Sequence, residues 1–213
     1  MSRLSSYRML RGYENLQKAI YSGVGEYDIP SLLPVTEISE VEKWISFNKA
    51  KTCRRTDNKG VHFFIDDYQF ERVWQQPDSY MRFLSGFAAV CTPDFSPYSD
   101  FPKVIQIYNH YRKHWLGAYW QENGITVIPT ITWSSPETLD WAFDGEPVGG
   151  VVALSSVGMF DTAEHRNWLI DGYNMMIDVL EPVAILWKGK VPNEIHNKTI
   201  IQIESHVDKW REE

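Results

Sequence analysis

The chain has 213 residues, of which 43% are hydrophobic and 14% aromatic, so it can supply the core of one α/β domain. Its formal net charge is −7. That charge argues against sequence-independent binding to a phosphate backbone, which needs concentrated lysine and arginine, so nucleic acid is an unfavoured partner.

The first 50 residues predict an irregular segment with one amphipathic helix. Residues 5–20 carry apolar side chains at helical spacing together with basic ones. We interpret the basic residues as a solvated helix face, with a phosphate or nucleic-acid contact as the alternative. Gly23, Gly25 and Pro30 then break the chain. No stretch here has the apolar length of a signal peptide, and none elsewhere is long enough to span a bilayer, so we expect a cytoplasmic protein without membrane contact.

From residue 61 onward, apolar runs of strand length alternate with helical patterns. Buried strands are predicted at 61–66, 86–91, 125–133, 149–156, 183–187 and 199–205. Helices are predicted at 70–74, 77–84 and 161–180. Another is predicted from a cap at Ser99 or Asp100 to Gly124, and a further one follows the capping box of Ser134 and Glu137.

Strands that are apolar throughout and alternate with helices are typical of a parallel sheet covered by helices. A complete eight-fold barrel usually takes about 250 residues. We therefore predict a single α/β domain over residues 1–213, built as an abbreviated or distorted (β/α) barrel, with an open doubly wound sheet as the alternative.

Polar side chains follow each predicted strand, and in parallel α/β folds these strand ends converge on one face. Asp66 and Asp94 are candidate catalytic residues, because neighbouring carboxylates share protons, act as general acid or base, or hold Mg²⁺. No motif specifies Mg²⁺, so the cofactor stays open. The alternatives are turn and cap chemistry, with Asp67 capping the next helix and Asp94 closing an Asx-turn around Pro93.

Candidate ligand contacts combine hydroxyls at strand ends with aromatic planes and cations. Aromatic planes suit nucleobases, whereas lysine and arginine suit phosphates. The predicted ligand-binding residues are Ser96, Arg112, Trp120, Gln121, Trp133, Ser134, Ser155, Ser156 and Lys188.

His110 and His114 have the four-residue spacing that chelates Zn²⁺ on a helix, but the glutamate that follows the first histidine of zinc proteases is absent. We interpret the pair as part of a solvated basic face with Arg112 and Lys113, and we predict no metal site. Cys91 has no histidine nearby in sequence to activate it, so we expect a buried small hydrophobe.

Residues 61–189 resemble a family known only as a domain of unknown function, which occurs in bacteriophages and bacterial mobile elements. The resemblance rests on five segments in order, namely 66–74 (DDYQFERVW), 92–96 (TPDFS), 111–133 (YRKHWLGAYWQENGITVIPTITW), 143–147 (FDGEP) and 155–158 (SSVG). It implies an accessory protein that works in the cytoplasm of a bacterial host. It implies no catalytic residue.

Three functions are compatible with these observations. The first is binding, with cleavage as an open question, of a phosphorylated or nucleotide-like small molecule at the strand ends. The second is binding and inhibition of a host protein, such as a defence protein, through exposed aromatic side chains. The third is nucleic-acid binding through the basic N-terminal helix and residues 103–114, which the overall acidity disfavours.

Overall fold

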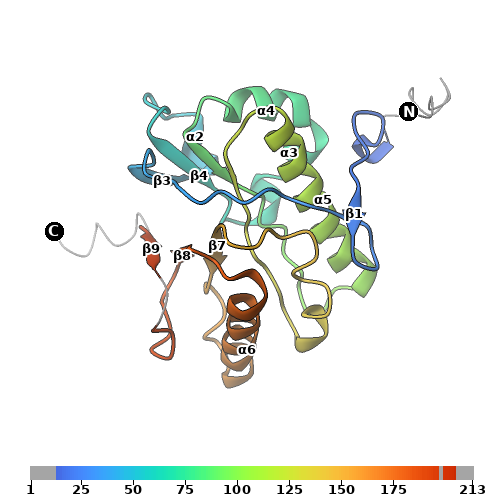
Figure 1. The fold of residues 1–213 in the computed structure, drawn as a ribbon, viewed down its shortest axis with the longest axis vertical. Helices are drawn as coiled ribbons and strands as arrows, with labels where there is room; N and C mark the ends of the chain where they lie inside the picture. Colours follow the sequence, from blue (N-terminus) through green and yellow to red (C-terminus); the bar gives the residue numbers. More distant parts are fainter. Residues whose placement is uncertain (1–12, 197–198, 205–213) are drawn as a thin grey trace.

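The computed structural model describes residues 13–196 and 199–204 as parallel strands alternating with helices (Figure 1). A short antiparallel hairpin comes first, with strands β1 (Gly23–Val24) and β2 (Ile29–Pro30). A four-stranded parallel sheet follows, which we call the first sheet, in the order β3 (Lys43–Ser46), β4 (Lys59–His62), β5 (Ala89–Cys91) and β6 (Val127–Ile128).

The second sheet has three parallel strands in the order β7 (Val151–Ser155), β8 (Ala184–Lys188) and β9 (Ile200–Ile203). Thr130, just past β6, forms an isolated parallel bridge with Ala153 of β7 and so links the two sheets. The predicted alternation of parallel strands and helices is thus confirmed. Both sheets are open, however, and the described strands form no closed barrel, because β3 and β9 each pair with a single neighbour.

The helices lie between the strands in chain order. The α-helices are α2 (Phe47–Ala50), α3 (Arg72–Gln75), α4 (Pro77–Leu84), α5 (Lys103–Glu122) and α6 (Ala163–Leu180). The 3₁₀ helices are η1 (Tyr13–Asn15), η2 (Asp67–Gln69) and η3 (Pro136–Thr138). Pro77 opens α4, as predicted, because its missing N–H has no partner in a first helical turn anyway.

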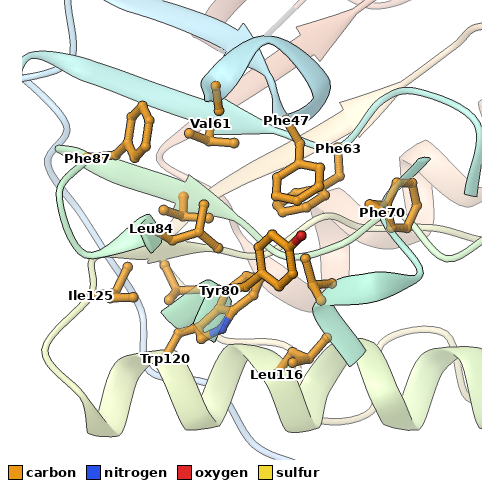
Figure 2. Packing of buried hydrophobic residues seen from close by; sticks show 14 of the residues in the cluster. Phe47, Val61, Phe63, Phe70, Tyr80, Leu84, Phe87, Leu116, Trp120 and Ile125 are labelled. Carbon is orange, nitrogen blue, oxygen red and sulfur yellow. The ribbon is translucent and has the colours of Figure 1, made fainter. Parts of the chain in front are cut away.

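Alternate residues of each strand point to opposite sides, so the sheets divide the core into separate clusters. One cluster lies between the first sheet and helices α4 and α5, where Leu116 and Trp120 of α5 meet Tyr80 and Leu84 of α4 (Figure 2). A second cluster packs α6 on the second sheet. A third collects the opposite strand faces from both sheets, namely Trp44, Ala89, Cys91, Ile128, Val151, Ala153, Leu186 and Ile203.

Four predicted elements need correction. The helix predicted after Ser134 is only the three-residue η3, which begins without a side-chain cap. Residues 13–20 form only the short η1 and a turn, since Glu14 and Asn15 have positive φ angles that no α-helix accommodates; residues 5–12 lie outside the described part. The strand predicted at 61–66 ends at His62, and the one predicted at 125–133 keeps regular pairing only at Val127–Ile128, ahead of Pro129, which has no N–H to donate.

Candidate functional site

A cavity of about 290 Å³ lies where the carboxyl ends of β5, β6 and β7 meet the start of α6. Five of the predicted site residues line it: Asp94, Ser96, Trp133, Ser134 and Ser155. The other lining residues are Pro97, Tyr98, Ser99, Ile131, Thr132, Leu154, Val157, Gly158, Met159, His165, Trp168 and Leu169. The lining is therefore a mixture of apolar and aromatic side chains with a few hydroxyls and one carboxyl, as in small-molecule sites.

The cavity wall depends on the packing of α6 against the loop that follows β6. Thr162 caps α6, and its hydroxyl accepts a hydrogen bond from His165 N at 3.0 Å. Trp133 is buried beneath the helix and donates from Nε1 to the Trp168 carbonyl at 2.8 Å. A Cβ on Gly172 would lie 2.2 Å from the Trp133 ring, so only glycine lets helix and indole approach so closely.

Asp94 is the ionisable group of the cavity whose pKa departs most from its ordinary value. Its carboxyl makes no hydrogen bond with any described residue. Burial and, secondly, the nearby Asp67 raise its pKa to about 7, against the opposing effect of the Lys113 ammonium. Such a carboxyl exchanges protons near neutral pH, as a general acid or base requires.

Asp67 joins the loops that follow β4 and β5. Its carboxylate accepts hydrogen bonds from Ser96 N at 3.0 Å and from Ser96 Oγ at 2.9 Å. Burial nonetheless raises its pKa above the ordinary value. The predicted helix cap by Asp67 is wrong, because η2 begins without a side-chain cap and the carboxylate instead orders Ser96 at the cavity.

Outside the cavity lining, Lys113 is fully buried and links the segment after β6 to the loop before β7. Its Nζ donates to the Thr130 carbonyl and to Glu146 Oε1, both at 2.8 Å. Glu146 Oε1 also lies 2.9 Å from His114 Nε2, and the side chains of both residues have no exposed surface. The interpretation of residues 110–114 as a solvated basic face is therefore wrong for His110, Lys113 and His114.

The predicted cations lie outside the cavity lining. Arg112 forms a bidentate ion pair with Glu71, at 2.7 and 2.8 Å, and its guanidinium stacks 3.7 Å above the Phe95 ring centroid. Lys188 Nζ donates to the Glu204 carbonyl at 3.1 Å, at the end of the second sheet. No lysine or arginine lines the cavity among the described residues.

Four further predicted residues also lie outside the lining. Trp120 is fully buried in the apolar cluster between the first sheet and helices α4 and α5 (Figure 2). Gln121 exchanges hydrogen bonds with the backbone of Leu33. Ser156 is buried and donates to the Lys190 carbonyl at 2.7 Å. Asp66 is exposed and accepts from Gln69 Nε2 at 3.2 Å.

Sequence reasoning missed two histidines near the strand ends. His62, the last residue of β4, is buried, and its desolvation, followed by the positive charge of Lys188, lowers its pKa to about 3. His165 lines the cavity from the first turn of α6 and contacts the Trp168 ring, with 5.3 Å between centroids. Cys91 is buried as expected, and burial raises its thiol pKa, which leaves it a poor nucleophile.

Comparison with known proteins identifies the relatives of this chain. The family described as Domain of unknown function (DUF4417) matches residues 21–206. The chain belongs to this family. It is 36% identical over 165 residues to the Gene 1 protein of Mycobacterium phage L5, covering 78% of this chain and 72% of the phage protein. This DUF4417 chain thus has relatives in phages, as the resemblance implied.

A second relative, the Gene 1 protein of Mycobacterium phage D29, is 36% identical over 166 residues, which are 78% of this chain but 61% of the D29 protein. The DUF4417 chain therefore spans about three fifths of that relative. No solved structure matches the chain. Within the described residues, no helix combines the length and apolar character needed to cross a membrane.

Proposed function

We propose that this DUF4417 protein binds a nucleobase-containing small molecule, free or phosphorylated, in the cavity at the ends of β5, β6 and β7, and that Asp94 transfers a proton in its cleavage. The observation that carries the proposal is the position of Asp94, whose pKa is raised to about 7, in the wall of that cavity. Carboxyls tuned in this way concentrate at functional sites.

The lining favours the base over the phosphate as the main recognised group. Trp133 and Trp168 supply aromatic surface, while Asp94, Ser96 and Ser155 supply hydrogen-bonding groups of the kind that read base edges. Because the lining residues include no lysine or arginine, a phosphate would rely on backbone N–H groups near Gly158 and on His165. We therefore place phosphorylated ligands second to bases and nucleosides.

A calorimetric titration tests the proposal with bases, nucleosides and nucleoside 5′-monophosphates as probes. Trp168→Ala and Asp94→Asn should each weaken binding of the best probe about tenfold or more, because each removes a direct contact. The exposed Asp100→Asn serves as a matched control and should bind as the wild type does. Turnover of the bound probe, followed by chromatography, should be lost in Asp94→Asn.

No binding of any probe to the wild-type protein would contradict the proposal, as would binding that Trp168→Ala leaves unchanged. Binding that survives Asp94→Asn together with full turnover would remove Asp94 from the chemistry. Native mass spectrometry of the protein as purified would complement the titration by identifying any co-purified ligand.

A second candidate is binding to a host protein, and it rests on exposed apolar side chains beside the cavity. Tyr98 and Phe101 are 49% and 39% exposed with ring centroids 4.9 Å apart, and Val104 and Ile105 extend the apolar stretch into α5. Exposed aromatic residues of this kind anchor protein interfaces. Under this alternative, Phe101→Asp abolishes capture of the partner and leaves small-molecule binding intact.

Nucleic-acid binding has less support than either. Of the basic residues at 103–114, Arg112 is paired with Glu71 and Lys113 is buried. Lys18 pairs with Asp78 at 2.5 Å, and the more N-terminal arginines lie outside the described residues. The absence of a salt-dependent affinity for duplex or single-stranded DNA would eliminate this candidate.

A further inference from the structure

We propose that His110, His114 and Glu146 bind one Zn²⁺ ion that links α5 to the loop carrying Glu146. The three residues come from α5 and from a loop more than thirty residues farther along the chain, and all three are buried. One potential ligand atom from each lies within 4.8 Å of the other two. The site is separate from the cavity, whose lining includes none of these residues.

The hydrogen bonds of the two histidines orient one nitrogen of each ring for a metal. His110 Nε2 lies 3.0 Å from the Asp144 carbonyl, and His114 Nδ1 lies 2.8 Å from the Pro30 carbonyl. A carbonyl only accepts, so each of these nitrogens carries the proton. Metal-binding histidines are oriented in this way: the N–H of one ring nitrogen donates a hydrogen bond to a backbone carbonyl, and the other ring nitrogen binds the metal.

The remaining nitrogens face Glu146 or have no partner. His110 Nδ1 and Glu146 Oε2 are buried and make no hydrogen bond with a described residue. His114 Nε2 lies 2.9 Å from Glu146 Oε1. With the proton of His114 on Nδ1, both Nε2 and Glu146 Oε1 are acceptors, so their contact needs an added proton or a cation between them. A metal ion supplies the missing partner for all three atoms at once.

The donor set is one that zinc sites in proteins use. Two histidines and one carboxylate are an established ligand set for Zn²⁺. All three residues are buried, so an ion at this place would be shielded from solvent.

Lys113 is the main electrostatic opponent of an ion here, because its ammonium lies 2.8 Å from Glu146 Oε1. It also donates to the Thr130 carbonyl, which holds it on that side of the carboxylate. Oε2 therefore remains for the metal. Zn²⁺ bound tetrahedrally at about 2.1 Å holds its ligand atoms roughly 3.4 Å apart. A pair of ligand atoms 4.8 Å apart must therefore approach by about 1.4 Å on binding.

The test measures metal content in the full-length protein, carrying no histidine tag, after incubation with Zn²⁺ and gel filtration. Elemental analysis should find about one zinc per chain. Replacement by Co²⁺ should give the visible absorption of a tetrahedral site, a readout that needs only the wild-type protein. Glu146→Gln and His110→Ala should lower zinc affinity on the order of 100-fold, while the exposed His196→Ala should not change it.

Thermal unfolding gives an independent readout, because a ligand bound only to the folded state raises Tm. Added Zn²⁺ should raise the Tm of the wild type and of His196→Ala, and a chelator should reverse the rise. Zinc-free wild-type protein without a Tm response or a Co²⁺ spectrum would overturn the proposal. One retained zinc with unchanged affinity in both Glu146→Gln and His110→Ala would also overturn it, by placing the ion elsewhere.

Discussion

At the scale of single residues, the position of Asp94 makes folding depend on pH. Its pKa is about 7 in the folded protein, against an ordinary value of 3.8, because the carboxyl is buried near Asp67. The folded state therefore keeps a proton that the unfolded chain has lost. Between pH 4 and 7 the folded form binds more protons than the unfolded form, so this residue's contribution to stability falls as pH rises.

We expect Asp94→Asn to remove this dependence, since the amide stays neutral. The free energy of unfolding of the variant minus that of the wild type should increase by about 2 kcal/mol from pH 5 to pH 8. Partial solvation of a carboxyl at a cavity wall limits this increase. Urea unfolding at both pH values measures the difference. The exposed Asp100→Asn is the control, and an equal stability difference for Asp94→Asn at both pH values would contradict the assignment.

The sequence predicts the cavity residues better than it predicts the buried polar cluster of Lys113, His114 and Glu146. Asp94, Ser96, Trp133, Ser134 and Ser155 follow apolar strands, and the parallel topology brings such positions together. The cluster depends on contacts between residues 113 or 114 and 146, which no local pattern encodes. The burial of Trp120 is unpredictable for a similar reason, because periodicity identifies a helix without showing which of its faces the sheet covers.

At the scale of elements, α6 is held in place by Trp133, which contacts the middle of the helix. The indole Nε1 bonds to the Trp168 carbonyl, and the ring lies against the glycine at 172. Alanine usually stabilises the interior of a helix relative to glycine, by about 1 kcal/mol. At this position the added Cβ meets the ring at 2.2 Å, so the steric conflict opposes the gain in helix propensity.

We expect Gly172→Ala to destabilise the protein by about 1 to 3 kcal/mol and to distort the cavity, because the ring or the helix must move. Asn174→Ala on the exposed face of α6 is the matched control and should be neutral or slightly stabilising. Thermal unfolding measures the first effect, and near-ultraviolet circular dichroism reports the displaced indole. A gain in stability for Gly172→Ala would contradict this prediction, because it would show that the Trp133 ring accommodates the added Cβ without destabilising the protein.

Long elements follow from the sequence more reliably than short ones. The spacing of apolar residues predicts α5 and α6, and apolar runs predict the strands from β4 to β9. The strand β3 was missed because only Trp44 and Ile45 of its four residues are apolar, and they point to opposite sides. Its pairing with β4 is a long-range interaction that overrides a weak local signal.

At the scale of the whole molecule, the described residues connect the two sheets through Thr130. Its backbone N–H donates to Thr92 Oγ1 at 2.8 Å, and its hydroxyl donates to the Thr92 carbonyl at 2.7 Å. On the other side, Ile131 N donates to the Ala153 carbonyl at 2.8 Å, and Ala153 N donates to the Pro129 carbonyl at the same distance. Thr130 is fully buried, so water cannot replace these bonds.

Thr130→Val keeps the shape of the side chain but removes its hydroxyl, and it leaves the buried Thr92 carbonyl without that donor. We expect a loss of about 1 to 3 kcal/mol and weaker coupling between the sheets, seen as faster amide exchange in β7 and β8 than in β4. Thr199→Val, at an exposed position beside β9, is the control. If both variants lose the same stability and show the same amide exchange, the Thr92–Thr130 pair does not couple the two sheets. The cooperativity of the sheets must then come from the apolar cluster that they share around Ala153 and Leu186.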